Sequence, residues 1–455
     1  MESGKELELM QAIYDRIYDM LTYGPQGKES GFSKDSSIFQ MVPGGIPINP
    51  EDFRDQLTPI NPNGNYNAAE YFSRMIDPIP KAQASYVRGS ANIDNTYGGI
   101  IKNSNCTTPV DEEGLKIYKE AYSFLNTVTK IKDYKGEVTE QIVNTPIYEN
   151  YIENRSAYVT AVSAYRNAYN DYDLTDPKEQ KQWQANEPML NLTVQTTYNK
   201  WRSQGAKQVE EALNALETTI NRAVAAIIAS DKETYEKARL ASSLGMGDWR
   251  LSYPMPSNWC DEKAKIFNRF TLNSKKMKVD ENSKFQQYGG KTSFGWGLWS
   301  VDASVEHSSE ENNRHTNCEN IEIKMEIAVV NLVRPWFDGN IFRMEGWHND
   351  AYPSGKISSG KFDDVNAAMP LVPTGFVIVK NVEIKGDFKG EDEFFAKQST
   401  TGGASIGYGP FRLGGHYSEG DSQHTFNSKY ENGTITIPGM QIIGFISEVI
   451  PYSPK

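Results

Sequence analysis

The hydrophobic residues in the first half of the chain recur at helical spacing. Ser3 and Glu6 match a capping box, and the residues after them repeat at intervals of three and four: Met10, Ile13, Tyr14, Ile17 and Leu21. Four tyrosines spaced by seven, from Tyr151 to Tyr172, mark one stripe of a later helix. A further long helix is predicted over 194–227, with Gly205 as a site for a kink. The stripes are typical of a core between packed helices, and a seam between subunits is the alternative.

Residues 25–108 interrupt this helical half. They are rich in Pro, Gly and Asn and show little periodicity, so we expect extended loops with short helices. A loop of this length is unusual inside a compact domain. It therefore suggests an arm that wraps on another part of the assembly, such as a neighbouring subunit.

The pattern changes at Gly245-Met246-Gly247. Beyond it Gly, Ser and Trp become more frequent, and a period of two replaces the helical period. We therefore expect an α+β protein with a helical part over 1–245, containing long amphipathic helices, and an antiparallel β-rich part over 246–455. The run 376–379 and the terminal run MQIIGFISEVIP are apolar on both faces, which predicts buried strands of a sandwich-like sheet.

One ribbon of alternating residues occurs twice in the β-rich part. SFGWGLWSVDASV begins at Ser293, and SIGYGPFRLGGHY begins 112 residues later at Ser405. In each copy a polar stretch follows the ribbon, and a second alternating segment follows the polar stretch. This arrangement predicts two related long β-hairpins, at 289–333 and 402–437, with tips in SSEENNRHTN and SEGDSQHT.

The apolar face of these hairpins is the candidate site for insertion into lipid or for contacts between subunits. Its residues are Trp299, Val301, Ala303, Val305, Ile321, Ile323, Met325, Ile327, Phe411, Leu413 and Tyr417. Each outgoing arm has about the length of a membrane-crossing strand, which needs roughly 9–11 residues. In the second copy, Asn432-Gly433 and Pro438 are expected to interrupt the return arm.

Four of the five histidines flank the predicted tips. They are His307 and His315 in the first copy and His416 and His424 in the second. Acidic residues accompany them, so protonation near pH 6 lowers the negative charge of both tips. They are candidate pH sensors for contact with an anionic surface, although polar residues of this kind are also common in ordinary turns.

Composition narrows the class of protein. The 455 residues are 38% hydrophobic, which is enough for sizeable cores, and the net charge of −12 disfavours binding to nucleic acid. The three cysteines lie far apart and predict reduced thiols. The sequence contains no recognisable signal peptide and no run of 18 apolar residues. We therefore expect synthesis in the cytoplasm, with any release by lysis or a dedicated export machine.

Two short motifs resemble catalytic or nucleotide-binding sequences but lack the surroundings that such sites need. The segment GASIG at 403–407 is followed by an alternating ribbon, whereas a nucleophile elbow needs a helix there. The segment at 355–361 resembles a phosphate loop, but Phe362 stands where Ser or Thr is needed. We therefore expect no enzymatic activity, no cofactor, no bound metal and no small-molecule substrate.

Several functions are compatible with the two ribbons. They can be ordinary strands of a sandwich, with one buried and one solvated face. They can also supply a membrane barrel closed by several subunits, since an isolated hairpin leaves backbone groups unpaired in lipid. In this layout, with paired Ser/Gly-rich amphipathic segments in one chain, the sequence resembles the perforin-type and related β-pore-forming toxins.

Pore formation after homo-oligomerisation on membrane lipid is therefore the leading expectation. The alternative is a structural, self-assembling protein in which the same hairpins and the N-terminal arm pair with neighbours in a filament, tube or lattice. An enzyme of another kind is the third option.

Overall fold

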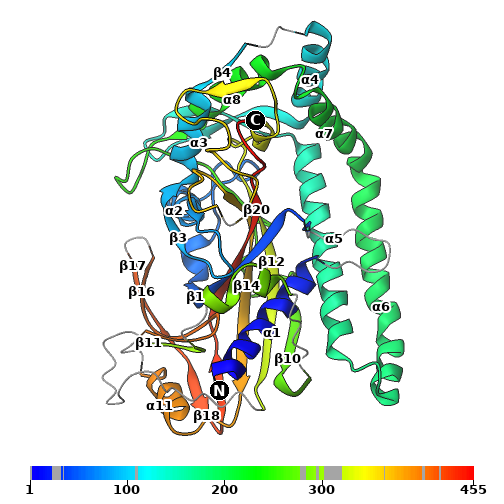
Figure 1. Ribbon diagram of the computed structural model, residues 1–455, viewed down its shortest axis with the longest axis vertical. Helices are drawn as coiled ribbons and strands as arrows, with labels where there is room; N and C mark the ends of the chain where they lie inside the picture. The colour runs from blue at the N-terminus through cyan, green and yellow to red at the C-terminus, as the bar shows by residue number, and fades with distance from the viewer. Residues whose placement is uncertain are drawn as a thin grey trace.

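The structure is a computed structural model that describes residues 3–22, 32–33, 35–107, 111–276, 283–293, 297–301, 320–362, 364–401, 405–419 and 422–455. Figure 1 shows a long central sheet with two long helices, α5 and α6, along one side and a group of shorter helices at the upper end. Helices and antiparallel strands both contribute, which confirms the predicted α+β class.

The central sheet has the strand order β1-β20-β14-β12-β10, with antiparallel neighbours. Its strands are β1 (Ser37–Ile48), β10 (Asn268–Asn273), β12 (Glu322–Val333), β14 (Leu371–Lys385) and β20 (Met440–Val449). Three short strands extend it: β9 (Tyr253–Met255), β18 (Lys429–Glu431) and β19 (Thr434–Ile437). The run 376–379 lies in the middle of β14 and is buried, as its apolar residues on both faces predict.

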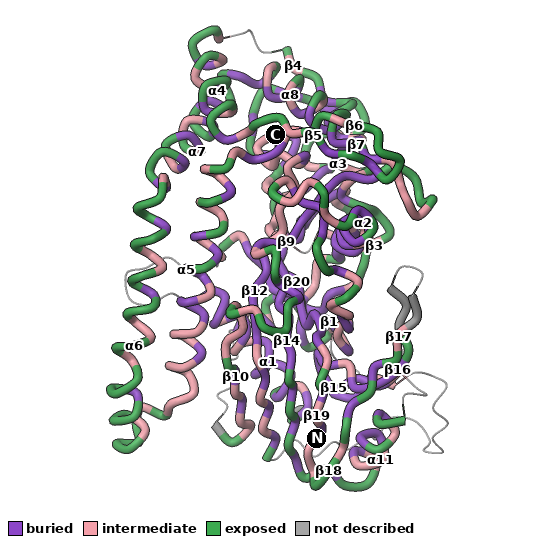
Figure 2. The backbone as a smooth tube through the Cα atoms, turned by 180° about the vertical axis from the view of Figure 1, so that it is seen from behind, coloured by how far each residue is buried: buried purple, intermediate pink, exposed green. Residues whose placement is uncertain are grey.

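Two hydrophobic cores lie on opposite faces of this sheet. Successive residues of a strand point to opposite faces, so β12 and β14 contribute to both. The core that includes α1 (Ser3–Thr22) contains Ile323, Met325, Val379, Ile384 and Ile437. The core on the other face contains Ala328, Val330, Phe376, Ile378 and Trp259. Figure 2 shows the resulting band of buried backbone along the sheet.

The N-terminal segment is part of this sheet. β1 forms one edge by pairing with β20, and the Tyr14 hydroxyl of α1 donates a hydrogen bond to the carbonyl oxygen of Phe39, 2.6 Å away. Sequence analysis predicted loops and short helices over 25–108 and missed this strand, because two prolines and two glycines weaken its pattern. A bulge between Met41 and Ile46 accommodates part of them. The split into a helical and a β-rich half is consequently only loose.

α5 (Pro146–Asp171) and α6 (Pro177–Trp201) pack through aromatic side chains. Tyr158 stacks on Trp201 with ring centroids 5.4 Å apart, and Tyr165 meets Trp183 edge-on at 5.4 Å. The tyrosine stripe therefore lies in a core between helices of one chain, as predicted. Gly205, with φ of +85°, interrupts the helical path before α7, which confirms the predicted kink.

The remaining elements form the upper end of the molecule and its connections. The helices are η1 (Pro50–Phe53), α2 (Tyr66–Met75), α3 (Ile93–Lys102), α4 (Glu112–Leu125), α7 (Lys207–Thr219), α8 (Val224–Lys237) and η4 (Gly339–Phe342). The strands are β2 (Pro78–Pro80), β3 (Arg88–Asn92), β4 (Ser104–Cys106), β5 (Asn126–Lys132), β6 (Val138–Asn144), β7 (Arg239–Leu240), β8 (Trp249–Arg250) and β13 (Trp347–Asn349). None of the helices in the described ranges combines the length and apolarity that crossing a bilayer requires.

Candidate functional site: two inserts at one end of the sheet

Two long inserts leave the central sheet at the same end. Insert 1 (residues 274–321) connects β10 to β12, and insert 2 (residues 386–433) connects β14 to β19. The pairs that close them are Asn273↔Glu322 and Lys385↔Thr434, and the pair Glu322↔Lys385 joins β12 to β14 between them. The four strand ends therefore lie side by side, at the lower end of the sheet in Figure 1.

The inserts match in length and in their offset along the chain. Each contains 48 residues, from 274 to 321 and from 386 to 433. The offset of 112 residues that relates Ser293 to Ser405 also relates Asn273 to Lys385 and Glu322 to Thr434. The repeat therefore includes the flanking strands and their pairing register as well as the glycine-rich ribbons.

The described parts of both inserts join in one small sheet of order β11-β15-β16-β17. Insert 1 contributes α9 (Lys284–Gln287), α10 (Gly290–Ser293) and β11 (Trp299–Val301). Insert 2 contributes α11 (Glu391–Gln398), β15 (Ile406–Tyr408), β16 (Phe411–Glu419) and β17 (Ser422–Asn427). The small sheet lies back against β1, where the Gly44 N–H donates to the Gly409 carbonyl at 2.9 Å.

The prediction of a β-hairpin at 289–333 is wrong. Its outgoing arm, β11, pairs with β15, whereas its return arm, β12, is a central strand between β10 and β14. The return arm lies inside the sheet because β12 becomes apolar on both faces at 327–330, which suits a strand with two neighbours. Its predicted tip, 308–317, lies outside the described residues.

The second copy does contain a hairpin. β16 and β17 pair from Gly414↔Asn427 to Glu419↔Ser422. The predicted interruption of the return arm at Asn432-Gly433 is confirmed, since both residues have positive φ and turn β18 into β19.

The residues predicted to face lipid or a neighbouring subunit are core residues of this chain. Those that are buried are Trp299, Ile321, Ile323, Met325, Ile327, Phe411 and Leu413. Val301 is half-buried against the same core, and Tyr417 lies in β16 opposite His424. Ala303 and Val305 lie outside the described residues. The expected exposure is therefore wrong for the buried residues, because the inserts and the central sheet close a shared core.

Trp299 illustrates how tightly the inserts pack together. Its indole N–H donates to the Asp392 carboxylate of α11 at 2.8 Å, and its ring meets Tyr408 at a centroid distance of 4.9 Å. Contact of this face with lipid requires the inserts to leave the shared core.

The small sheet continues the register of the central sheet. In a regular antiparallel pair, the two residue numbers have a constant sum. This sum is 707 for Glu322↔Lys385 in β12–β14 and again 707 for Val301↔Ile406 in β11–β15. It is 819 for Lys385↔Thr434 in β14–β19 and again 819 for Tyr408↔Phe411 in β15–β16. Gly407↔Arg412 also has the sum 819, whereas Ile406↔Gly414 has 820, so a one-residue bulge lies in β15–β16. Apart from this bulge, straight strands across the gap yield one continuous sheet in the same register.

The midpoint of insert 2 is a turn, and the midpoint of insert 1 includes a bend at Leu298. The two midpoints are Gly297-Leu298, here called apex 1, and Gly409-Pro410, called apex 2, and the 112-residue offset relates them. Both glycines have positive φ, +91° and +56°, a conformation that glycine adopts without strain. The apexes contact each other, since the Gly409 N–H donates to the Leu298 carbonyl at 2.7 Å. Insert 2 thus carries a turn, and insert 1 a positive-φ glycine followed by a bend, where a long hairpin needs its tip.

Helix α1 holds both apexes. The Glu6 carboxylate accepts the N–H of Leu298 at 3.2 Å, and the Met10 sulfur lies 3.2 Å from the position that a Cβ on Gly409 would take. Gln11 donates to Ser283 of insert 1 at 3.0 Å. The sequence predicted the helix, with Glu6 in a capping box and no role for Gln11, because only the structure reveals that both polar side chains are buried.

One candidate pH sensor contacts an acid. His424 Nε2 lies 2.9 Å from Asp52 Oδ2 in η1 and 3.5 Å from the Asn49 amide nitrogen. His416 is exposed, with Nδ1 3.0 Å from the Thr425 hydroxyl, and His307 and His315 lie outside the described residues. His424 therefore links the β16–β17 hairpin to the body of the protein.

Replacing Asp52 with alanine is expected to loosen this hairpin. A partly exposed side-chain contact of this kind contributes about 0–1 kcal/mol, so amide exchange in β17 is expected to accelerate by up to about fivefold. Hydrogen exchange at pH 6 checks this, with Glu51→Ala as the matched control on the same turn. Equal β17 exchange in both variants would show that the pair does not hold the hairpin.

Comparison of the chain with protein-family models, curated proteins and solved structures finds no match. In the ranges that the structure describes, no three His, Cys, Asp or Glu side chains gather as metal ligands would. The inserts are therefore the feature from which a function can be inferred.

Proposed function

We propose that this protein is an oligomerising, membrane-active protein of pore-forming type, whose two inserts open into amphipathic β-hairpins. The observation that carries the proposal is the shared register of the two sheets, with sums of 707 and 819 in each. An unrelated small sheet has no reason to reproduce the pairing of the strands from which it departs. The folded inserts are better explained as a stored form of longer hairpins.

The opened hairpins are long enough to reach across a bilayer. Half of a 48-residue insert, 24 residues, extends about 80 Å at roughly 3.3 Å per residue. The hydrocarbon core of a bilayer is about 30 Å thick. Each hairpin can therefore project well beyond the body of the protein before its tip enters lipid.

The segments next to the apexes have the pattern of barrel strands. After apex 1 the apolar residues are Trp299, Val301, Ala303 and Val305, and after apex 2 they include Phe411, Leu413 and Tyr417. These stretches match the roughly 9–11 residues of a membrane-crossing strand, with lipid-facing and water-facing side chains in alternation.

Several copies of the chain are needed for such a pore. A hairpin in hydrocarbon leaves its edge N–H and C=O groups unpaired, which costs several kcal/mol for each group. A closed ring of subunits removes these edges. The expected partners are therefore further copies of this chain and membrane lipid.

Helix α1 keeps the inserts folded in this proposal. It occupies the core that both inserts share and binds their apexes through Glu6 and Met10. Opening requires α1 to separate from them, and α11 and the β16–β17 pairing to be replaced by straight strands. These contacts are the barrier that membrane binding or assembly has to overcome.

Leakage of dye from liposomes tests the proposal. The purified protein is added to phosphatidylcholine–phosphatidylserine vesicles at pH 7 and pH 5.5, and the samples are imaged by electron microscopy. Release of dye together with ring-shaped particles on the vesicles is expected. Sealed vesicles at both pH values, at protein concentrations where the protein binds them, would contradict pore formation.

A structural, self-assembling protein is the second candidate. The observation that favours it is β17, which pairs with β16 on one side and forms the edge of the small sheet in the described part of the chain. Such an edge can pair with a neighbour. In electron micrographs of lipid-free protein, fibres, tubes or lattices support this candidate, whereas isolated particles argue against it.

A further inference from the structure

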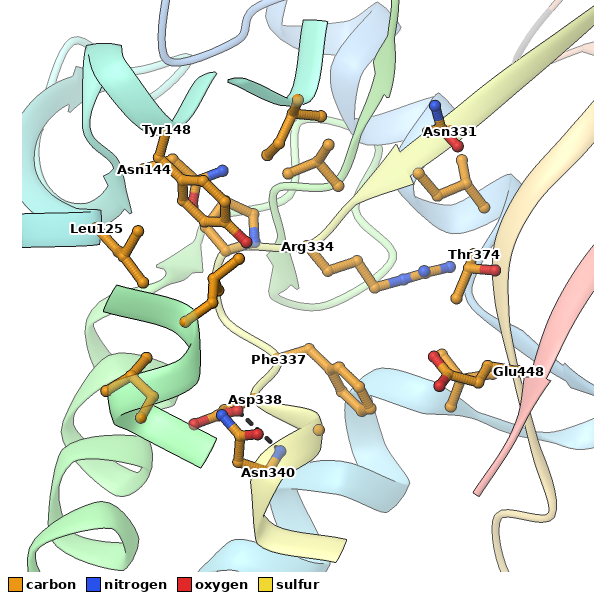
Figure 3. A pocket seen from close by; sticks show the side chains of 18 of the residues that line it. Leu125, Asn144, Tyr148, Asn331, Arg334, Phe337, Asp338, Asn340, Thr374 and Glu448 are labelled. Atoms are coloured by element: carbon orange, nitrogen blue, oxygen red, sulfur yellow. Dashed lines mark hydrogen bonds between the residues drawn. The ribbon is translucent and has the colours of Figure 1, made fainter. Parts of the chain in front are cut away.

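A cavity of about 770 Å³ lies between the upper helices and the central sheet. Helices α4, α5, α7 and α8 line one side of it, and the segment after β12 and the ends of β14 and β20 line the other (Figure 3). Small-molecule sites typically have volumes of about 300–1,000 Å³. The cavity is remote from the inserts, which lie at the other end of the sheet.

Two acids without strong cationic partners line this cavity. Asp231 of α8 is 3% exposed, and its Oδ2 atom has no hydrogen-bond partner in the described part of the chain. Burial raises the pKa of Asp231 well above its ordinary value, and the charge of Asp338 raises it further. A buried carboxylate normally requires a paired cation or hydrogen bonds, which makes this one costly as it stands.

Asp338 is only partly satisfied. Its carboxylate accepts the Asn340 N–H at 2.9 Å, as Figure 3 shows, and burial raises its pKa. The cation that lowers this pKa is Arg343, which is itself bonded to Glu448 at 3.3 Å.

Arg155 and Arg334 also line the cavity, and Arg334 is directed elsewhere. Arg334 donates to the carbonyl oxygens of Pro373 and Ile76, at 2.5 and 2.9 Å. Burial lowers its pKa to about 10, and the charge that opposes this effect is that of Asp77, outside the cavity lining. Arg334 therefore does not neutralise the two acids.

Aromatic rings line the same cavity as the acids. They belong to Tyr122, Tyr148, Trp336 and Phe337; burial raises the pKa of Tyr122 and of Tyr148, and the charge of Asp338 adds to this effect. The faces of such rings carry negative potential and attract cations, most of all where water is excluded. Carboxylates and ring faces thus both favour a cation as the ligand.

We propose that this cavity binds a small organic cation, with its ammonium group near Asp231 and Asp338 and its alkyl groups against Tyr148, Trp336 and Phe337. The ammonium group supplies the positive charge that pairs with the carboxylates of Asp231 and Asp338. The aromatic rings favour an alkylated ammonium over a metal ion, because they contact its methyl groups as well as its charge. The source of such a group is a free amine or a choline lipid headgroup.

Calorimetric titration of the full chain at pH 8 with choline chloride tests the site. The control ligand is 3,3-dimethylbutan-1-ol, which has the same shape without the charge. Choline is expected to bind about tenfold or more tightly than the alcohol. Titration with glycerophosphocholine, the lipid headgroup without acyl chains, then separates the sources: stronger binding than choline indicates a headgroup, and weaker binding indicates a free amine.

Asp231→Asn is expected to weaken choline binding by about tenfold or more and to leave binding of the alcohol unchanged. The variant is also expected to melt no lower than the wild type without ligand, because it removes an uncompensated buried acid. Glu120→Gln, on the exposed face of α4, is the matched control and is expected to bind choline normally. Equal affinity for choline and the alcohol, no binding of either, or normal choline binding by folded Asp231→Asn would overturn the proposal.

Discussion

A covalent link between α1 and insert 1 is expected to abolish membrane leakage without unfolding the protein. The Gln11 amide and the Ser283 hydroxyl are 3.0 Å apart, so cysteines at both positions can be joined by a short bifunctional reagent that contains a cleavable disulfide. The native Cys106, Cys260 and Cys318 are replaced first. Because α1 occupies the core from which the inserts must leave, the linked protein is expected to lose at least about 90% of its leakage.

A second link provides a matched control. Val301 and Ile406 are directly opposite in β11–β15, at a separation that suits a disulfide, and their register sum of 707 is the same in the opened sheet. Val301→Cys/Ile406→Cys is therefore expected to leak normally when oxidised. Reduction is expected to restore leakage to the α1-linked protein. Full leakage by the linked protein, or a block by both links alike, would contradict insert opening in the present register.

Removal of the Arg250 guanidinium is expected to cause the largest loss of stability at the upper end of the molecule. Arg250 Nη1 lies 2.6 Å from Asp94 Oδ1, and both side chains are largely buried. The guanidinium also lies over the Tyr235 ring, 3.3 Å from its centroid. Arg250→Met leaves Asp94 buried without its cation, so the free energy of unfolding is expected to fall by about 3–5 kcal/mol.

Denaturant unfolding measures this loss, and a double variant isolates its cause. Asp94→Asn together with Arg250→Met removes both charges and is expected to recover at least half of the lost stability. An Arg250→Met protein within about 1 kcal/mol of the wild type would show that the ion pair does not stabilise the fold.

Local patterns allowed the helices and the buried strands to be predicted. The kink at Gly205 and the aromatic core between α5 and α6 depend on residues that are close in sequence or lie on one helix face. Such patterns can be recognised without knowledge of the fold. The run 376–379 was predictable because a segment that is apolar on both faces needs neighbours on both.

The alternation of apolar and polar residues did not allow the pairing partner of each strand to be predicted. β11 alternates as a hairpin arm does, yet alternation fixes which face is buried and not which strand lies alongside. The apolar face of Trp299 and Phe411 was expected to meet lipid or another subunit, whereas the chain covers it with its own α1 and central sheet. A sequence cannot distinguish these partners, because all of them are equally apolar.

The cavity left no recognisable signal in the sequence. Asp231 follows Ser230 in a helix that also carries exposed charges, where an acid usually faces solvent. Its burial arises from α4, α7 and the segment around Trp336, which are distant along the chain. The 112-residue repeat, by contrast, was visible, and its extension to the closing pairs became apparent only with the strand register.

The distance between the base of insert 2 and a residue near its tip tests the opening of the inserts most directly. Spin labels are placed on the exposed residues Lys385, at the start of insert 2, and His416, beyond apex 2. In an opened hairpin His416 lies opposite residue 403, 18 residues from Lys385, so the labels are expected to separate to about 60 Å on leaking vesicles. A distance on leaking vesicles that stays at its value in solution would contradict the opening of the inserts into hairpins.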